Sequence, residues 1–567
     1  MEARGAQDRP EQKAAEKDEG SDSGHHQFMG AARVVAGVTL VSRFGGLARD
    51  AVCSRIFGAG PVWSSFALAF VIPNLFRRLF GEGALSAAFI PEYARLLRED
   101  PEQARRFASA TLAVVTLGLA GLTLVGEAVL WGLLAWTALG ESGGLTLRLA
   151  MVMLPFMPLV CLTALLGGML QTHGRFAETA AAPIVLNALM IAAAVAWGWL
   201  MRASLEATAF AVAVAVVSAG AVQVAWSLAA LRGRAGWTRE MGGAGASLGR
   251  LARRMGPAML GLGALQINTF LDGIIAGWPV LFGPTIGLPG LGETTYPLDE
   301  SSNAVLFFTQ RLYQFPLGVF GIALATAVFP ALAHAAGSSD RFAATLRRGL
   351  RLSLFIGLPA SAGLIAVRSD LAAVVLGGGR FSTEDSARVA TVLLGYAPAI
   401  WAYAASHVYT RAFYAQGDTT TPMRISLVVV AADLCLNVIL IWPLREAGLA
   451  WSTSICATGQ CIALAVLARR RFNDTGGHPA LRASVWRMLA LTVGMGAVLL
   501  GAGWALERTA LAGSGDAPLS WAGHLVRLAL LVAAGVGLYL GGARLLRMKE
   551  LGWLVERDVE RGMDSPR

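Results

Sequence analysis

The sequence has few charged residues for its length. Asp, Glu, Lys and Arg make up 15% of its 567 residues, whereas soluble globular chains contain about 25%. Hydrophobic residues make up 55% of the chain, and the mean hydropathy is +0.56. This combination excludes an ordinary soluble enzyme. We therefore expect a multi-pass membrane protein, which is built from spans of about 20 apolar residues rather than from separate cores.

Motifs for catalysis and for metal binding are missing as well. The sequence contains no Walker motif, no GxSxG elbow and no HExxH, so neither nucleotide hydrolysis nor hydrolase chemistry is indicated. The five cysteines lie in apolar stretches without CxxC or Cys/His spacing. This placement argues against a zinc site or a disulfide framework and is typical of small packing residues.

Long apolar segments fill most of the chain and predict fourteen spans. A polar tail at 1–28 precedes them; it lacks the apolar region of a signal peptide and is expected to be disordered. The spans lie near 30–54, 61–80, 106–137, 148–171, 176–201, 207–231, 255–279, 302–335, 349–376, 387–415, 422–444, 447–468, 484–507 and 521–545.

The net charge of +10 is explained by the connections between these spans. Arginines collect on the even-numbered connections, whereas the odd-numbered ones at 280–301 and 509–520 contain no Lys or Arg. Under the positive-inside rule, this pattern places both termini in the cytoplasm. The excess charge therefore sets membrane orientation, and we expect no nucleic-acid partner.

Two stretches of the chain resemble each other. FGEGALSAAFIP at 80–91 follows Ile72-Pro73, and FGIALATAVFP at 320–330 follows Phe315-Pro316. The two stretches fall in spans two and eight, and an offset of six spans preserves membrane orientation. This indicates two parallel six-helix halves with spans 13 and 14 appended. Chance similarity between Ala- and Leu-rich segments is the alternative.

A few charges lie inside the apolar spans. The first span carries Arg43, Arg49 and Asp50, and at 100° per residue Arg43 and Asp50 lie nearly on one face. An arginine at the bilayer centre costs about 2.5–3.5 kcal/mol on insertion scales, so these side chains must face water, a partner or a ligand. Further polar residues lie at the end of span two and in span eight: Asn74, Arg77, Arg78 and Glu82, and Gln310, Arg311 and Gln314.

Two interpretations of these arginines are open. In the first, the arginines of span two anchor the end of a helix, and Arg43 pairs with Asp50 as structural glue. In the second, four arginines line a water-filled cavity and bind an anionic group, since guanidinium forks suit phosphate oxygens. Basic residues without acidic equivalents favour an anion over a cationic drug. These four are Arg43, Arg49, Arg77 and Arg311.

A second polar set is sparser. Asp272 lies in span seven, Asp433 and Asn437 lie one helical turn apart in span eleven, and Thr453 lies in span twelve. Oxygen ligands of this kind suit a hard monovalent cation such as Na⁺, and an interhelical hydrogen-bond cluster is the alternative.

Four motifs in order resemble the MurJ/MviN lipid II flippase family. This family belongs to the superfamily of multidrug, oligosaccharidyl-lipid and polysaccharide exporters, and the resemblance extends over about residues 30–545. The motifs are SRFGGLARDAVCSRIFGAG at 42–60, FVIPNLFRRLFGEGALSAAFIPEY at 70–93, TQRLYQFPLGVFGIALATAVFPALA at 309–333 and RAFYAQGDTTTPMRI at 411–425.

The resemblance implies an all-α polytopic membrane protein with about fourteen transmembrane helices. Two six-helix lobes would be followed by two extra C-terminal helices that form a groove for a lipid tail. The units expected in this chain are a tail at 1–28, an N-lobe at 29–231, a basic cytoplasmic linker at 232–254, a C-lobe at 255–476, spans 13 and 14 at 477–545 and a cytoplasmic tail at 546–567.

The resemblance also implies a transporter rather than an enzyme, located in the bacterial inner membrane. It would move lipid II, the undecaprenyl-pyrophosphate-linked disaccharide-pentapeptide, from the cytoplasmic to the periplasmic leaflet by alternating access. Its other partners would be membrane lipids and cell-wall synthesis proteins, and its only cofactor a coupling ion such as Na⁺. The pyrophosphate would be held by Arg43, Arg49, Arg77 and Arg311, with Asp50, Arg78, Glu82, Asn74 and Gln314 in support.

The chain departs from the family pattern at several positions. Ser64 stands where an aspartate is usual, Gln314 stands where an acid is common, and the connection at 280–301 is longer than usual. Some relatives bind sodium at the positions of Asp272, Asp433, Asn437 and Thr453. Here the Asp and the Asn of span eleven occur in swapped order.

Three other functions fit parts of the pattern. They are export of another polyprenyl-linked glycan, antiport of a drug or cation, and a non-transporting scaffold for cell-wall machinery. The arginines disfavour the antiporter, which would need acids in its cavity, whereas the pyrophosphate of another glycan lipid would be the same.

Overall fold

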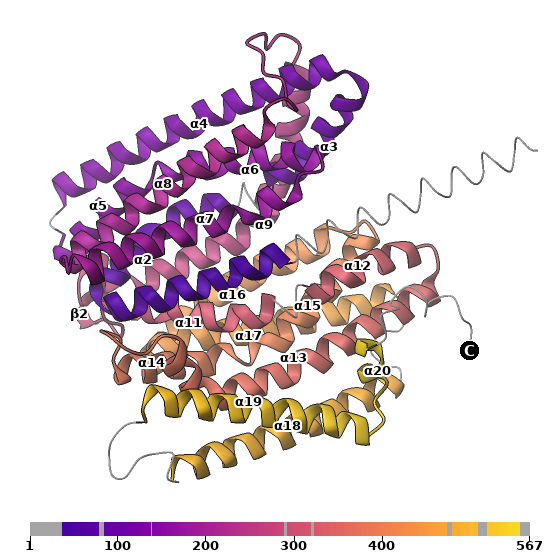
Figure 1. Cartoon of the computed structure of the whole chain (residues 1–567). Coiled ribbons are helices and arrows are strands. Elements are labelled where there is room, and N and C mark those ends of the chain that lie inside the picture. Colours follow the sequence, from indigo (N-terminus) through magenta and orange to yellow (C-terminus); the bar gives the residue numbers. More distant parts are fainter. Residues whose placement is uncertain are drawn as a thin grey trace, which may run out of the picture.

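The computed structural model describes residues 37–78, 84–137, 139–288, 292–318, 323–472, 479–508 and 519–555. Nearly all of these residues are helical, as the all-α prediction requires (Figure 1). Within the described residues, the strands are β1 (Thr285–Leu288) and β2 (Gly292–Thr295), which pair antiparallel. The tail predicted at 1–28 and the residue Glu82 lie outside the described ranges.

The helices of the first half follow the first six predicted spans. The first helix covers 37–57. It is followed by α2 (Pro61–Phe76), α3 (Ala84–Glu99), α4 (Pro101–Trp136), α5 (Glu141–Met153), α6 (Phe156–Thr172), α7 (Phe176–Ala194) with its π-helical end η2 (Val195–Leu200), and α8 (Leu205–Leu231).

The second half continues with spans seven to fourteen. Its helices are α9 (Gly245–Ala276), α10 (Trp278–Phe282), α11 (Ser302–Pro316), α12 (Ala323–Ala335), α13 (Ser339–Val375), α14 (Thr383–Tyr396), α15 (Ala399–Ala415), α16 (Thr420–Leu444), α17 (Glu446–Arg471), α18 (Pro479–Glu507), α19 (Trp521–Leu545) and α20 (Lys549–Val555).

Length and apolar composition support most of the predicted spans directly. In the described part of the chain, nine helices are long and apolar enough to cross a membrane, and the bent pair α14–α15 makes ten. The other four predicted spans fall on the first helix, on α2, on α9 and on α11–α12. All four carry arginines or prolines, which interrupt their hydropathy.

Spans two and eight, predicted at 61–80 and 302–335, are helical in their described residues, and both change from α-helical to π-helical geometry after a proline. Helix α2 contains Pro73 and ends in a π-helical turn at 77–78, and α11 ends at Pro316 in a π-helical turn at 317–318. A proline removes a backbone donor and disturbs the regular helix, and π turns are frequent at functional sites. This shared geometry agrees with the sequence similarity between the two spans.

Two predicted connections are partly helical. The connection between spans two and three contains the whole of α3 and, after Asp100, the start of α4. The Asp100 side chain accepts hydrogen bonds from the backbone N–H groups of Glu102 and Gln103 and so caps α4. The predicted linker at 232–254 becomes helical at Gly245, and Arg250 of α9 binds the buried Glu92 of α3 at 2.9 Å. These helical segments contain charged residues and therefore lay outside the predicted apolar spans. Charged residues do not, however, prevent helix formation.

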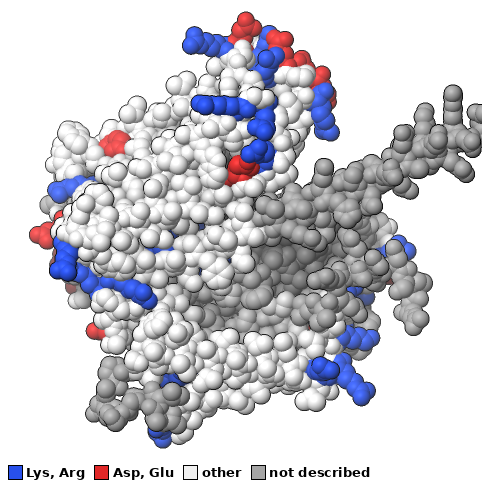
Figure 2. Space-filling view, in the orientation of Figure 1, with Lys and Arg blue, Asp and Glu red and all other residues white. Residues whose placement is uncertain are grey.

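The two ends of the molecule differ in their connections. The "basic end" carries the even-numbered connections, and the "hairpin end" carries the odd-numbered ones together with β1 and β2. Charged residues in Figure 2 gather toward the ends, and the broad face between them is nearly uncharged. Large apolar side chains are exposed on the membrane-spanning helices, such as Leu124 of α4 (71%) and Val428 of α16 (70%). This surface suits the hydrocarbon of a bilayer.

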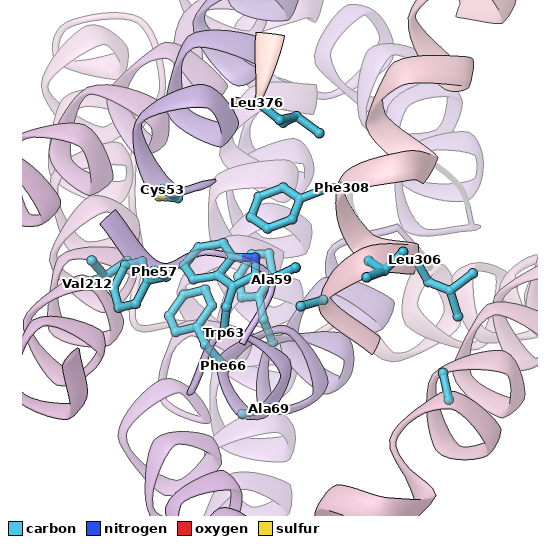
Figure 3. Packing of buried hydrophobic residues seen from close by; sticks show 14 of the residues in the cluster. Cys53, Phe57, Ala59, Trp63, Phe66, Ala69, Val212, Leu306, Phe308 and Leu376 are labelled. Atoms are coloured by element: carbon cyan, nitrogen blue, oxygen red, sulfur yellow. The ribbon is translucent and has the colours of Figure 1, made fainter. Parts of the chain in front are cut away.

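The two lobes are packed together at the hairpin end around Trp63 of α2. Trp63 is fully buried and lies 5.7 Å from the ring centroids of Phe307 and Phe308 of α11. Figure 3 shows Trp63 and Phe308 together with Phe57 and Phe66. Because α2 belongs to the N-lobe and α11 to the C-lobe, this aromatic cluster joins the lobes.

Hydrogen bonds at the same end reinforce the closure. The buried Ser64 Oγ accepts from the backbone N–H of Ala304 at 3.0 Å, and its carbonyl accepts from Asn303 Nδ2 at 3.0 Å. In this chain, the position that usually holds an aspartate therefore makes a neutral contact between the lobes. A carboxylate there would have to be desolvated in the aromatic cluster, which a hydroxyl avoids.

Candidate functional site

The first helix lies between the two lobes, as the indigo ribbon in Figure 1 shows. On its N-lobe side, Asn187 of α7 accepts a hydrogen bond from Arg49 Nη1 at 3.1 Å and donates to the carbonyl of Ser42 at 3.3 Å. On its C-lobe side, Phe44 packs against Phe315 of α11 with ring centroids 5.4 Å apart. Charges on this helix can therefore interact with both lobes.

Asp50 stands between two arginines from different lobes. Arg49 and Asp50 are almost fully buried, and Arg49 donates from Nε at 2.9 Å and from Nη2 at 2.6 Å to Asp50 Oδ1. Arg311 of α11 is more distant, with Nε 3.7 Å from Asp50 Oδ2. Asp50 thus pairs closely with Arg49 and holds Arg311 only through a long ion pair.

Arg311 retains donor capacity. Its guanidinium lies over the ring of Phe307 at 4.9 Å, and its Nε is buried without a hydrogen-bond partner among the described residues. The side chain is 26% exposed. A buried guanidinium N–H without a hydrogen-bond partner destabilises the folded protein unless a ligand accepts its hydrogen bond. Arg311 is therefore the residue of this group best prepared to bind an anion.

Arg43 reaches the C-lobe at the π-helical turn of α11. A Cβ atom on Gly318 would lie 1.7 Å from Arg43 Nη1, so the guanidinium lies directly against the Gly318 backbone. Only a glycine permits this approach. The π-helical turn of α11 thus leaves room for Arg43 at Gly318.

The π-helical turn of α2 supplies two further arginines. Arg77 Nε donates to Asn74 Oδ1 at 3.0 Å, and Arg78 Nη1 donates to Gln266 of α9 at 3.4 Å. Both charges, together with Arg49, repel that of Arg311. The structure therefore brings the predicted arginines of spans one, two and eight into one electrostatic neighbourhood. The Gln314 side chain forms a hydrogen bond with that of the preceding residue, Tyr313, and Glu82 lies outside the described residues.

This arrangement suits a multivalent anion. Arginines outnumber the acid among them, Asp50, and they come from both lobes around one helix. In a low-dielectric setting, planar guanidinium groups bind phosphate oxygens through paired, charge-assisted hydrogen bonds. An anion bound by arginines of both lobes would have an affinity that depends on the relative position of the lobes.

The second predicted polar set also comes together, between α9, α16 and α17. Asn437 Nδ2 donates to Asp272 at 2.6 Å and to Asp433 at 3.3 Å, and Asn268 Nδ2 donates to Asp433 at 2.8 Å. Ser452 donates its hydroxyl proton to Asp433. The predicted ligand Thr453 instead donates to the carbonyl of Leu449 in its own helix at 2.9 Å.

An apolar groove of about 600 Å³ starts beside the arginines and runs along the C-terminal helices. Leu47 of the first helix and Phe315 of α11 line it close to the charged site. Leu364 of α13, Leu499 of α18 and Val536 of α19 line it further away. The groove therefore joins the charged site to the helices of spans 13 and 14.

Several neutral residues of these clusters were not predicted from the sequence. Asn187 orients Arg49, Gln266 contacts Arg78, and Asn268 and Ser452 bind Asp433. Each is a single amide or hydroxyl within an apolar helix, and that is the signal that could have found it. Such residues are common in membrane helices, however, so the signal is weak without the fold.

Comparison with known proteins agrees with this geometry. The family model described as "Lipid II flippase MurJ" matches residues 53–513. A probable lipid II flippase MurJ from Vibrio cholerae is 31% identical over 545 residues, which cover 91% of this chain and 96% of that protein. A solved lipid II flippase MurJ in an inward closed conformation has a TM-score of 0.72 at 19% identity and covers 91% of this chain and 99% of its own.

A more distant solved structure shares the fold. It is an inward-facing multidrug resistance transporter of the MATE family and the MOP superfamily, with a TM-score of 0.60 at 15% identity over 80% of this chain and 99% of its own. The transporter architecture is therefore common to proteins with different substrates, and the residues of the site must indicate what is carried.

Proposed function

Because the chain belongs to the MurJ family of lipid II flippases, we propose that it moves lipid II across the bacterial inner membrane, from the cytoplasmic to the periplasmic leaflet. It is a multi-pass transporter and works by alternating access. The observation that carries the assignment of the substrate site is the arginine group around Asp50, in which Arg311 Nε lacks a partner among the described residues. The pyrophosphate of lipid II would supply that partner.

The substrate would replace Asp50 as the main partner of Arg311. Asp50 holds Arg311 at 3.7 Å, a distance that leaves room for a stronger phosphate contact. Binding Arg43 and Arg49 from the first helix and Arg311 from α11 at the same time would draw the lobes together near the site. The ligand drives the change of state only through its different affinity for the two states.

The orientation follows from the basic end. We propose that the basic end, with both termini, faces the cytoplasm, because arginines concentrate on its connections. The lobes are closed at the hairpin end by the Trp63 cluster, so in this proposed orientation the periplasmic exit would be shut. The prenyl tail would lie in the apolar groove, which begins at Leu47 and Phe315 beside the arginines. Contacts with cell-wall synthesis proteins stay a prediction.

The test of the assignment is replacement of a known flippase. A conditional strain that depends on a lipid II flippase should grow after depletion when this chain is expressed, and its membranes should move lipid II to the periplasmic leaflet. Growth without restored lipid II movement would point instead to a scaffold. Failure of growth with normal membrane abundance of the chain would contradict the assignment and favour another polyprenyl-linked glycan.

We further propose that the cluster of Asp272 and Asp433 binds a monovalent cation such as Na⁺. Among the described residues, Oδ1 of Asn268 and Oδ1 of Asn437 are buried and accept no hydrogen bond. These two amide oxygens and the two carboxylates are hard oxygen ligands of the kind that such a cation prefers. A bound cation would also offset the repulsion between the two carboxylates, and so these residues fit the ion despite their swapped order.

Sodium is therefore expected to stabilise the purified protein through Asp433. At about 100 times its dissociation constant, an ion bound only by the folded state adds about 2.7 kcal/mol, and the Asp433→Asn variant should lose this gain. The measurement is the thermal midpoint in NaCl against choline chloride. Thr453→Val is the matched control, because that hydroxyl contacts its own helix. Equal midpoints in the two salts for the unmodified chain would contradict the ion site.

A further inference from the structure

A buried ionic cluster joins the C-terminal helix pair to α13 near the hairpin end. Asp370 of α13 is 1% exposed, and Arg527 of α19 donates from Nε to both of its oxygens, at 2.8 and 2.7 Å. His524 Nδ1 lies 2.7 Å from the same carboxylate, and Arg527 also donates to Glu507 of α18 at 3.0 Å. This "outer clamp" therefore ties three helices together.

A second cluster joins the same helices near the basic end. Glu550 of α20 is 1% exposed, and its Oε1 accepts from Arg351 Nε of α13 at 2.6 Å and from the hydroxyl of Ser484 of α18. Burial alone would raise the pKa of Glu550, but these hydrogen bonds outweigh it and the pKa is lowered. Arg348 and Arg351 also lie over the ring of Trp553, at 4.9 and 4.8 Å. We call this set the "inner clamp".

The two clamps enclose the apolar groove. Arg351 and Asp370 are separated along α13 by roughly 28 Å at 1.5 Å per residue, which is close to the thickness of the hydrocarbon core. Between them, Phe355 and Leu364 of α13 face Leu531 of α19 across the groove. The clamps are thus placed at the two borders of the membrane, with the groove between them.

Helices α18 and α19 need such fixation. Most of their residues are exposed in the direction of the lipid. Lipid tails are as apolar as these side chains, so burial of apolar surface does not drive helix association inside a bilayer. Packing and polar contacts must do so. The groove between α13, α18 and α19 reduces the number of packing contacts between these helices. The clamps must therefore contribute more of the free energy that holds them together.

We propose that the outer and inner clamps hold α18 and α19 on α13 during transport, so that the groove moves with the C-lobe as one body and keeps the prenyl tail in register with the pyrophosphate site. Asp370, Arg527, Arg351 and Glu550 are positioning residues for the tail, since they act through the groove walls and not on the headgroup. This inference rests on the proposed lipid II transport.

The experiment compares two ligands that share the lipid II headgroup, one with the undecaprenyl tail and one with a short tail of three isoprene units. Binding of each to the purified full chain in lipid nanodiscs is measured for the unmodified chain, Arg527→Ala and Glu550→Ala. Glu550→Ala alters a helix outside the spans and so avoids a folding defect within the membrane. Arg508→Ala is the matched control, because Arg508 stacks on the exposed Trp504 next to the outer clamp.

The unmodified chain should prefer the long tail. In both clamp variants we expect affinity for the long-tailed ligand to fall about tenfold and affinity for the short-tailed ligand to change by less than about twofold, because only tail packing is lost. Arg527→Lys, which keeps the charge, should restore most of the preference.

Three results separate the hypotheses. Equal loss for both ligands in Glu550→Ala, or no loss, would overturn the role of the clamps, and so would an unmodified chain without tail preference. Failure of the unmodified chain to bind either ligand would instead contradict the proposed function.

Discussion

Arg311→Ala is expected to abolish lipid II transport while leaving the protein in the membrane. Arg311 is the arginine that the C-lobe contributes to the site through α11, and its Nε has no partner among the described residues. Hydrogen bonds to charged groups contribute about 1.5–3 kcal/mol each, so loss of a bidentate phosphate contact should weaken binding by at least about 100-fold. The cell would then no longer grow on this chain alone.

The variant should fold, because alanine leaves Asp50 paired with Arg49 at 2.6 Å. Arg311→Lys keeps the charge without the planar fork and should retain part of the affinity. Arg148→Ala removes an exposed arginine of α5 and serves as the control for general loss of positive charge. Binding of the lipid to purified protein and complementation are both measured. Normal transport by Arg311→Ala would refute the assignment of the substrate site.

The spans could be predicted from the sequence because hydropathy depends on local composition alone. The π-helical turns in spans two and eight could not be predicted from hydropathy, which does not distinguish π-helical from α-helical geometry. Yet these turns shape the site. The π-helical turn after α11 presents Gly318 to Arg43, and the turn after α2 carries Arg77.

The charged members of the site were recognisable because arginine is rare inside apolar spans. Their grouping required the fold, as the neutral residue Asn187 shows: its amide binds Arg49 across 138 residues of sequence. The same limit applies to Asp370 and Arg527, which are separated by 157 residues. Both charges are visible in spans nine and fourteen, but nothing local to either residue indicates that they meet. Pairing of distant charges is a property of tertiary packing.

Gly379→Ala is expected to open the hairpin end and to stop transport by trapping the outward-facing state. Gly379 follows α13 in the C-lobe and has φ +60°, and an added Cβ would lie 2.2 Å from the carbonyl oxygen of Arg55 at the end of the first helix. The clash is with backbone, which cannot turn aside as a side chain can. The hydrogen bond from the backbone N–H of Arg380 to the same oxygen, at 2.9 Å, would be lost with it.

The size of the effect follows from these terms. An alanine in the left-handed region costs about 1–2 kcal/mol and an overpacked contact about 1–3 kcal/mol, and the contact term is paid only while the lobes are closed. A bias of about 3 kcal/mol changes the ratio of the two states roughly 150-fold. Gly58→Ala should act in the same direction but more weakly, because its Cβ would lie 2.8 Å from the Arg380 carbonyl oxygen.

A native cysteine reports the opening. Cys53 is fully buried in the aromatic cluster beside Trp63 (Figure 3), whereas Cys435 is exposed and must first be replaced by serine. In that background, a membrane-impermeant maleimide added from the periplasmic side should label Cys53 faster in Gly379→Ala than in the parent chain. Gly174→Ala is the matched control, since its φ is +75° but its Cβ would meet no atom within 4 Å. If Gly379→Ala transports normally and Cys53 stays protected, the contact between Arg55 and the residues around Gly379 does not hold the lobes closed. The closure must then depend on the Trp63 cluster and the hydrogen bonds of Ser64.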